Sequence, residues 1–359
     1  MLSFFKKPFV FALLYSLCLV GALCFSLMDV FVIPTPDTST EYETLDFSQF
    51  FPSGETDTQK ENILENVTSA IPTLTLPPIG GVVEPTPDTD ATEDNDPEVI
   101  PDQTEAETPT PSYPIITDDT YIDQHITIRI TTLRRYDSDI HVAEVIIDDP
   151  SYLKTALARD KFGTNITEET SDQAQRVGAI LAINGDYYGA NKTGYVVRNG
   201  TLYRDSQRST KYQDLAIFYD GSMDVFYEKD VAVRDIWQKR GAMQIMAFGP
   251  TLVYNGQIVV GQNEEVGVAS PNGNPRTVIG MVEPLHYYFV VADGRTSSSH
   301  GPSLYEMADI MTELGCTLAY NLDGGGSSTM VFNGKVINYP TTNGNYKERS
   351  VSDIVYIGY

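Results

Sequence analysis

Three consecutive glycines at Gly324–Gly326 constrain this chain more than any other sequence feature. They follow the apolar run Thr317–Tyr320, with Asp323 directly before them and Ser327 and Ser328 directly after them. Glycine loses more backbone entropy on folding than any other residue, so a triglycine segment in a folded domain needs a geometric reason. We expect the reason to be close approach to a ligand, with several backbone N–H groups directed at an anion. A tight bulge without a ligand is the alternative.

The negative charge of the chain is concentrated in one segment. The formal net charge is −25, and residues 33–120 hold 20 acidic residues against a single lysine, Lys60, together with 13 of the 21 prolines. A nucleic-acid partner is excluded because no basic patch is present. A segment of this composition cannot bury enough apolar surface to offset its ordering entropy. We therefore expect residues 33–120 to be a disordered, extended linker.

An uncharged apolar run from Pro8 to Met28 follows Lys6 and Lys7. About 20 apolar residues are enough for a helix to cross the bilayer core. Basic residues precede the run and acidic residues follow it, which places the N-terminus in the cytoplasm and the bulk of the chain outside. Residues 1–32 are therefore predicted to be a cytoplasmic stub and a signal anchor, single-pass in the cell membrane. A cleaved signal peptide is the alternative.

From Tyr121 the sequence has the pattern of a folded domain. Residues 125–131 and 141–147 read as half-buried strands, and several Asn-Gly and Asp-Gly dipeptides predict hairpins. Ser303 and Glu306 fit a capping box at the start of a helix. Residues 121–359 are therefore predicted to form one α+β domain, a large and mostly antiparallel β-sheet system with two or three packing helices.

Polar clusters stand at the ends of four apolar strands. They cover residues 184–189, 274–277, 292–301 and 321–328. Strand ends are places where a rigid scaffold presents reactive side chains. Carboxylates gathered with arginines suit acid–base work on an anionic substrate, because a carboxyl can donate or accept the proton while a guanidinium binds a phosphate. The candidate catalytic residues are Asp186, Asp293 and Asp323.

Other interpretations of these residues stay open. Each cluster alone is typical of an ordinary turn. A metal site built from the same aspartates ranks second, because no loop has regular ligand spacing. Cys316 is the only cysteine after residue 24, so no disulfide within the domain and no cysteine-type zinc site is expected. His300 lies in a serine-rich loop, where it can contact a phosphate or only solvent, and His141 is interpreted as structural.

Five motifs, in order, resemble the phosphodiester glycosidase domain family, the family of the N-acetylglucosamine-1-phosphodiester α-N-acetylglucosaminidase. The motifs are Asn184-Gly185-Asp186-Tyr187-Tyr188, Gly249-Pro250-Thr251-Leu252, Asn274-Pro275-Arg276-Thr277, Asp293-Gly294-Arg295 and Asn321-Leu322-Asp323-Gly324-Gly325-Gly326-Ser327. The resemblance covers roughly residues 121–359. It implies hydrolysis of a sugar-1-phosphodiester, which releases the sugar and a phosphomonoester.

The resemblance also implies roles for individual residues. Arg276 and Arg295 would hold the phosphate, and the three aspartates would supply the acid, base or nucleophile. Tyr187 and Tyr188 stand where many relatives have phenylalanines, so their hydroxyls can alter the sugar pocket. The candidate binding residues are Asn184, Arg276, Arg295, His300, Asn321, Gly324, Gly325, Gly326 and Ser327.

The sequence as a whole predicts a membrane-anchored extracellular glycosidase of a bacterial surface. Its partner would be a phosphorylated glycan of the cell surface or cell wall, cleaved without a cofactor, although a divalent cation on the aspartates is left open. One alternative is a non-catalytic glycan-binding or wall-anchoring module that uses the same cleft. The other alternative is a metal-dependent phosphodiesterase.

Overall fold

The computed structural model describes residues 8–31, 33–37, 42–46, 50, 113–264, 266 and 273–359. All of these described residues belong to one compact unit. Most of the predicted linker, residues 51–112, lies outside the described residues.

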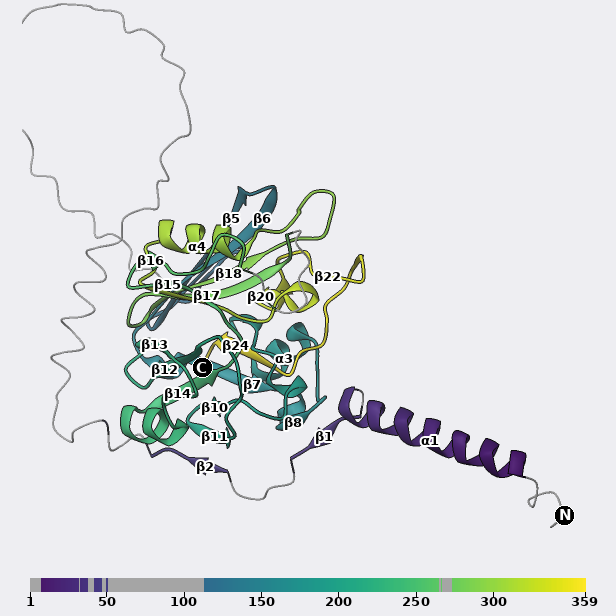
Figure 1. Ribbon diagram of the computed structural model, residues 1–359. Helices are drawn as coiled ribbons and strands as arrows, with labels where there is room; N and C mark the ends of the chain where they lie inside the picture. The colour runs from purple at the N-terminus through teal and green to yellow at the C-terminus, as the bar shows by residue number, and fades with distance from the viewer. Residues whose placement is uncertain are drawn as a thin grey trace, which may run out of the picture. The chain divides into compact units, whose positions relative to one another are not determined.

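Three antiparallel sheets form the body of this unit (Figure 1). The nine-stranded sheet has the order β16 (Gln257–Ile258), β15 (Thr251–Tyr254), β19 (Leu318–Asn321), β17 (Arg276–Glu283), β18 (His286–Ala292), β6 (Ser138–Ile147), β5 (Ile126–Arg135), β4 (Thr120–Ile122), β3 (Ile115–Ile116). The six-stranded sheet has the order β13 (Met223–Phe226), β12 (Asp214–Phe218), β14 (Ala242–Met246), β10 (Val196–Arg198), β11 (Thr201–Arg204), β2 (Glu43–Thr44). The five-stranded sheet has the order β21 (Lys335–Val336), β20 (Met330–Phe332), β9 (Leu181–Asn184), β24 (Asp353–Ile357), β7 (Leu153–Leu157).

Short elements complete the described structure. Two small ladders pair β1 (Thr35–Pro36) with β8 (Gly163–Thr164) and β22 (Thr341–Thr342) with β23 (Asn345–Tyr346). The α-helices are α1 (Pro8–Phe31), α3 (Thr170–Val177) and α4 (Leu304–Glu313). The single-turn helices are η2 (Pro150–Tyr152), η3 (Ala158–Asp160), η4 (Tyr188–Ala190), η5 (Asp235–Lys239) and η6 (Gly325–Ser327).

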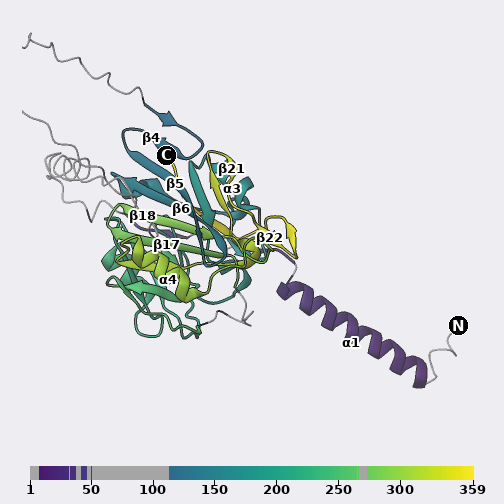
Figure 2. The same cartoon turned by 90° about the horizontal axis from the view of Figure 1, so that it is seen from above.

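The central strands of the nine-stranded sheet are buried on both faces, which explains the unbroken apolar run of β18. Tyr287 and Phe289 point into the core shared with the five- and six-stranded sheets. Tyr288 and Val290 point to the opposite face, where α4 packs. Figure 2 shows α4 lying over β17 and β18. A strand covered on both sides has no polar face, so its residues cannot alternate in polarity.

The sequence signals around α4 are confirmed. The Ser303 side chain accepts a hydrogen bond from Glu306 N, and the Glu306 side chain accepts one from Ser303 N. Gly315 follows the helix with φ of +79°, the left-handed conformation that ends many helices. With α3 packed on the five-stranded sheet, the predicted α+β class with mostly antiparallel strands is confirmed.

The structure differs from the predicted boundaries of the linker. Within residues 33–120, β1 pairs with β8 and β2 pairs with β11, and Leu45 is buried in an apolar cluster. The expected domain start at residue 121 falls inside β4. The physical reason is that a few residues can complete a sheet edge through backbone hydrogen bonds, which composition does not report.

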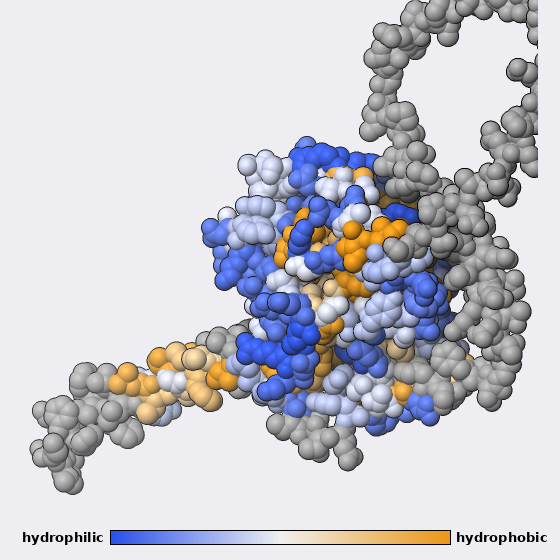
Figure 3. Space-filling model, turned by 180° about the vertical axis from the view of Figure 1, so that it is seen from behind, coloured by the Kyte–Doolittle hydropathy of each residue, from blue (hydrophilic) through white to orange (hydrophobic). Residues whose placement is uncertain are grey.

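The N-terminal helix α1 exposes apolar side chains along its described part, including Leu17, Leu23 and Phe25 (Figure 3). The sequence predicted a membrane-spanning helix within residues 1–32. Among the residues that the structure describes, no helix is long and apolar enough to cross a membrane.

Candidate active site

The glycine-rich segment lies against the ends of β9 and β17. Asp323 N donates to the Gly185 carbonyl oxygen (3.3 Å), and Asn184 Nδ2 donates to the Asp323 carbonyl oxygen (2.7 Å). Gly325 N donates to the Pro275 carbonyl oxygen (2.8 Å). Three motifs that are up to about 140 residues apart in the chain therefore meet through their backbones.

The fourth motif joins through its arginine. Arg295 Nε and Nη2 both donate to Asn274 Oδ1, at 3.0 and 2.7 Å. A Cβ atom on Gly294 would lie 2.6 Å from Pro275 N, so only glycine allows this approach. Arg295 has φ of +60°, an uncommon backbone conformation for a residue other than glycine. The predicted meeting of the motifs is thus present in the fold.

The backbone N–H groups of the triglycine segment do not form the predicted anion site. Gly324 N donates to Asp323 Oδ1 (2.9 Å) and Gly325 N to Pro275. Ser327 N donates to the Gly324 carbonyl oxygen (3.3 Å). These three donors have partners inside the protein and are therefore not directed at a ligand.

Close packing explains the glycines instead. A Cβ atom at Gly324 would lie 2.9 Å from the Pro275 carbonyl oxygen, and one at Gly326 would lie 2.6 Å from the Thr342 hydroxyl oxygen. Gly325 has φ of +64°, and a Cβ atom there would lie 3.1 Å from Arg295 Nη2. The segment therefore gives the arginine room to lie against the backbone.

Asp323 is the carboxyl that lies directly beside the glycine segment and is partly accessible to solvent. Its Oδ2 accepts a hydrogen bond from Ser327 Oγ (2.6 Å), and Arg349 Nη2 lies 3.7 Å from the same oxygen. The side chain is 11% exposed. Burial raises the pKa of Asp323 and outweighs the opposing effects of Arg349, Ser327 and the Gly324 N–H. A raised carboxyl pKa at a partly open position is typical of a reacting group.

Arg349 is a site residue that the sequence analysis missed. Its Nε donates to Ser327 Oγ (2.9 Å), and its Nη2 donates to the Gly324 carbonyl oxygen (2.7 Å). The side chain is 45% exposed, so part of the guanidinium faces solvent. Arg349 follows the Asn343-Gly344 turn without a motif of its own. Only its contacts with the glycine segment reveal it.

Two guanidinium groups flank the glycine segment. Burial lowers the pKa of Arg295, and the positive charge of Arg349 lowers it further. Arg295 makes no ion pair with a carboxylate in the part of the chain that the structure describes. Arg295 and Arg349 are two neighbouring positive charges, and Asp323 is the one carboxylate that lies within 4 Å of either among the described residues. This arrangement favours an anionic ligand, and the planar guanidinium group matches the geometry of a phosphate.

Asp186, the first predicted catalytic residue, is held in a buried ion-pair cluster. It lies 2.9 Å from Arg198 Nη2, and Arg198 Nε donates to Asp353 Oδ2 (2.7 Å). Tyr188 N and Ala247 N also donate to Asp186, at 3.0 and 2.7 Å. Burial raises the pKa of Asp186, but Arg198 and the two N–H groups hold it below its ordinary value. With 1% exposure, this carboxylate is better suited to a structural role.

Asp293, the second predicted catalytic residue, is also enclosed. Its Oδ2 lies 3.2 Å from His141 Nε2, and its Oδ1 accepts hydrogen bonds from Asn338 Nδ2 (3.1 Å) and Tyr339 N (2.8 Å). Asn338 Nδ2 also donates to the Ser328 carbonyl oxygen (3.1 Å). Asp293 is therefore an internal hydrogen-bond acceptor that holds Asn338 and Tyr339, and through Asn338 it is linked to Ser328.

The remaining predicted binding residues have mixed placements. Asn184 Oδ1 accepts from Thr277 Oγ1 (2.8 Å), which makes Asn184 a buried tie between strands. Asn321 is buried and donates to Gly249. Arg276 is buried, with its Nε donating to the Pro302 carbonyl oxygen (3.2 Å). The His300 carbonyl oxygen accepts from Arg295 N (3.1 Å), and the residue is exposed.

The three predicted aspartates belong to separate contacts: Asp186 with Arg198, Asp293 with His141 and Asp323 with Arg349. Within the described residues, no group of three or more histidines, cysteines, aspartates or glutamates is placed to hold a metal ion.

Comparisons with known proteins identify the family and the fold of this chain. The profile of the phosphodiester glycosidase family matches residues 177–358, just over half of the chain. SPbeta prophage-derived uncharacterized protein YomE of Bacillus subtilis (strain 168) is 31% identical over 202 residues, which are 55% of this chain and 31% of that protein. N-acetylglucosamine-1-phosphodiester alpha-N-acetylglucosaminidase of Mus musculus is 29% identical over 184 residues, 47% of this chain and 35% of that protein.

The chain thus spans about a third of the length of these curated relatives. Among solved structures, the catalytic domain of the zebrafish N-acetylglucosamine-1-phosphodiester alpha-N-acetylglucosaminidase superposes with a TM-score of 0.52 at 22% identity. That superposition covers 65% of this chain and 83% of the zebrafish chain, and it shows a shared fold.

Proposed function

This chain belongs to the phosphodiester glycosidase family, a class of hydrolases, and from that premise we propose that it cleaves a sugar-1-phosphodiester linkage. The products would be the free sugar and a phosphomonoester. The observation that carries the proposal is the placement of Asp323, a carboxyl with a raised pKa, beside Arg349 and the glycine segment that Arg295 lies against.

The chemistry assigns different tasks to these groups. Asp323 accepts a proton from a water molecule, whose oxygen forms a bond to the anomeric carbon. The bond between that carbon and the phosphate oxygen breaks, and its electron pair leaves with the phosphate. Arg295 and Arg349 stabilise the phosphate by charge-assisted hydrogen bonds. A raised pKa makes Asp323 a stronger base than an ordinary aspartate.

The relatives suggest the first substrate to test. The mouse protein and the zebrafish structure are both named for N-acetylglucosamine-1-phosphodiester. We therefore propose an amino-sugar-1-phosphodiester as the model substrate, and a phosphorylated surface or cell-wall glycan as its larger form. The exposed hydroxyl of Tyr187 is a reason to compare several sugars, whereas the Tyr188 side chain is buried with its hydroxyl facing the Ser352 carbonyl oxygen, so the expectation that it alters the sugar pocket is wrong.

The decisive experiment uses the full chain and a synthetic N-acetylglucosamine-1-phosphodiester. We expect release of the sugar by the native chain and a loss of about 10²- to 10⁴-fold in Asp323→Asn. The variant should fold at least as stably, because burial disfavours the charge that it removes. Asp118→Asn, an aspartate with 94% exposure, is the matched control and should keep full activity.

The same assay separates the alternatives. A non-catalytic glycan-binding module would bind the diester without turnover in every variant. A metal-dependent phosphodiesterase would lose activity with a chelator, whereas the proposed reaction would not. A folded native chain with no turnover on any sugar-1-phosphodiester would contradict the proposal.

We also propose that the domain works outside a bacterial cell, held at the cell membrane by its N-terminal residues. The support is the sequence alone: Lys6 and Lys7 before an uncharged run, followed by an acidic, proline-rich segment. Protease added to intact cells should then remove residues 113–359 from the cell fraction. Full protection until lysis would contradict this location.

A further inference from the structure

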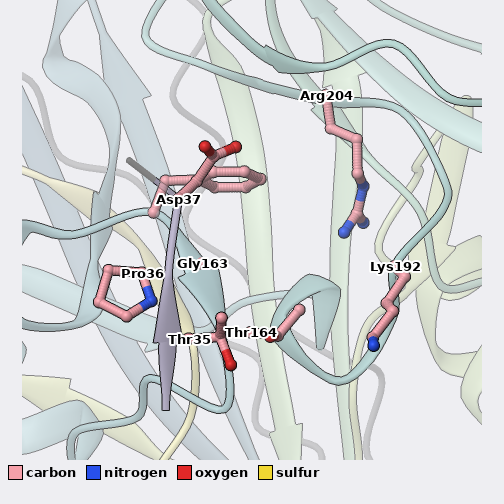
Figure 4. A pocket seen from close by; sticks show the side chains of 8 residues that line it. Thr35, Pro36, Asp37, Gly163, Thr164, Lys192 and Arg204 are labelled. Atoms are coloured by element: carbon pink, nitrogen blue, oxygen red, sulfur yellow. The ribbon is translucent and has the colours of Figure 1, made fainter. Parts of the chain in front are cut away.

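A cavity of about 370 Å³, whose lining does not include Asp323, lies beside the first motif (Figure 4). It is lined by Thr35, Pro36, Asp37, Phe162, Gly163, Thr164, Lys192 and Arg204. One wall is β1, from the N-terminal segment, and the opposite wall is the loop and strand that carry Lys192 and Arg204. Cavities that bind small molecules begin at about 300 Å³.

The two cations of this cavity have no carboxylate partner. Arg204 donates only to carbonyl oxygens, those of Gly194 (2.6 Å), Asn191 (2.5 Å) and Tyr188 (3.4 Å). Neither Arg204 nor Lys192 makes an ion pair among the residues in the described ranges. Burial lowers the pKa of Arg204 and outweighs the opposing effect of Asp186, which makes no direct contact with it. Such a site favours an anion.

A second cavity provides an internal contrast. It has about 300 Å³ and is lined by Lys211, among others, but Lys211 Nζ lies 2.5 Å from Glu264 Oε1. Its cation is therefore neutralised within the protein. The two cavities are similar in size and both contain a lysine, but only in the first does the lysine make no ion pair with a carboxylate of the described residues.

We propose that the first cavity binds a phosphate group carried by a saccharide, at a site separate from Asp323. A lysine ammonium and a fixed guanidinium are common phosphate ligands, and the hydroxyl of Thr164 adds a donor. Asp37 is the one carboxylate in the lining, and Figure 4 shows it on the side away from Lys192 and Arg204. The cavity therefore offers a positive end for the phosphate.

The cavity is connected to the first motif by a single residue. Tyr188 N donates to Asp186 Oδ1 (3.0 Å), while the Tyr188 carbonyl oxygen accepts from Arg204. A phosphate here would suit a second charged unit of a substrate polymer. That role rests on the proposed function, whereas phosphate binding itself does not depend on it.

The test measures binding in the full chain carrying Arg349→Gln, which weakens the phosphate contacts at Asp323. Inorganic phosphate, glucose-1-phosphate and glucose are titrated by calorimetry. We expect both phosphates to bind, with glucose-1-phosphate the tighter, and glucose alone not to bind. Lys192→Glu should weaken phosphate binding about tenfold or more, and Lys192→Arg should restore it.

Lys211→Glu is the matched control and should leave phosphate binding unchanged. Lys192 is exposed, so its variants should fold normally, and thermal unfolding without ligand checks this. The proposal is overturned if Arg349→Gln binds no phosphate, or if Lys192→Glu and Lys211→Glu bind it equally. Because no turnover is measured, loss of the cavity site and failure of the proposed hydrolysis give different results.

Discussion

Two clusters in this protein each combine an aspartate that follows a β-strand with an arginine, but they differ in exposure to solvent. Asp186 follows β9 and pairs with Arg198, which also contacts Asp353, and all three are buried. Asp323 follows β19 and lies near Arg349, whose guanidinium is partly in solvent. In the first cluster, Arg198 lies within 3 Å of two carboxylates, at 2.9 and 2.7 Å. In the second cluster, Asp323 lies 3.7 Å from Arg349.

The difference distinguishes Asp186 from Asp323, while burial also raises the pKa of Asp353 in the first cluster, to about 6. The pKa of Asp186 is held below its ordinary value by Arg198 and two N–H donors, which oppose burial. The pKa of Asp323 is raised by burial, because its cation lies farther away. A satisfied buried ion pair holds strands together, whereas an incompletely compensated one near solvent can exchange a proton.

Removing the cation of the buried cluster should have the largest effect on stability. Arg198→Met leaves Asp186 and Asp353 without their shared counter-ion, which should lower the free energy of unfolding by about 3–5 kcal/mol. Urea unfolding followed by circular dichroism measures it. Arg129→Met, at a half-exposed ion pair, is the control and should change stability by less than about 1 kcal/mol. Equal effects would remove the distinction between the two clusters.

Removing the cation of the second cluster, Arg349 beside Asp323, should lower the rate of the reaction rather than the stability of the fold. Arg349→Gln should lower kcat/KM for a sugar-1-phosphodiester about 10- to 100-fold, with little change in the unfolding midpoint. The reason is the loss of a charged contact to the phosphate at a side chain that is 45% exposed. Arg240→Gln, a partly exposed arginine of another ion pair, is the control. An unchanged kcat/KM would exclude Arg349 from the site.

Adding a methyl group to the glycine segment should have a smaller effect on both stability and phosphate binding. Gly325→Ala places a Cβ atom at φ of +64°, 3.1 Å from Arg295 Nη2. We expect a loss of about 1–2 kcal/mol in stability from the backbone conformation and a lower affinity for phosphate. Gly334→Ala, also at positive φ but with no neighbour within 4 Å of the added Cβ, separates the two effects. Equal affinities in both variants would show that Arg295 does not bind phosphate.

The pH profile gives the smallest and most specific change. As the base, Asp323 must be ionised, so activity should fall as pH decreases through its raised pKa. Arg349 is one of the groups that lower this pKa, so Arg349→Gln should move the acidic limb of the profile to higher pH. Rates measured between pH 4 and pH 8 (a range set about the ordinary aspartate pKa) test this. A limb that moves to lower pH would contradict the assignment of Asp323 as the base.

The sequence predicted the parts of this site that depend on local pattern. The capping box at Ser303 and the hairpin dipeptides report neighbours in the chain, and the five motifs carried the family resemblance. Arg349 and the interaction of Arg198 with two carboxylates were missed, because each depends on contacts between residues far apart in sequence. The expected N–H anion site was not found at Gly324 and Gly325, since Gly324 N donates to Asp323 in the same motif and Gly325 N to Pro275 in another.

By itself, the sequence determined which residues are available: an α+β domain with aspartates and arginines at strand ends, and a glycine segment that permits close approach. Only the tertiary structure decided that Asp186 is fully buried in an ion pair and that Asp323 lies nearer to solvent. Residue type sets the intrinsic pKa and hydrogen-bonding capacity of a side chain. Burial and the distance to the nearest counter-ion then set its charge state, and both arise only when the sheets pack.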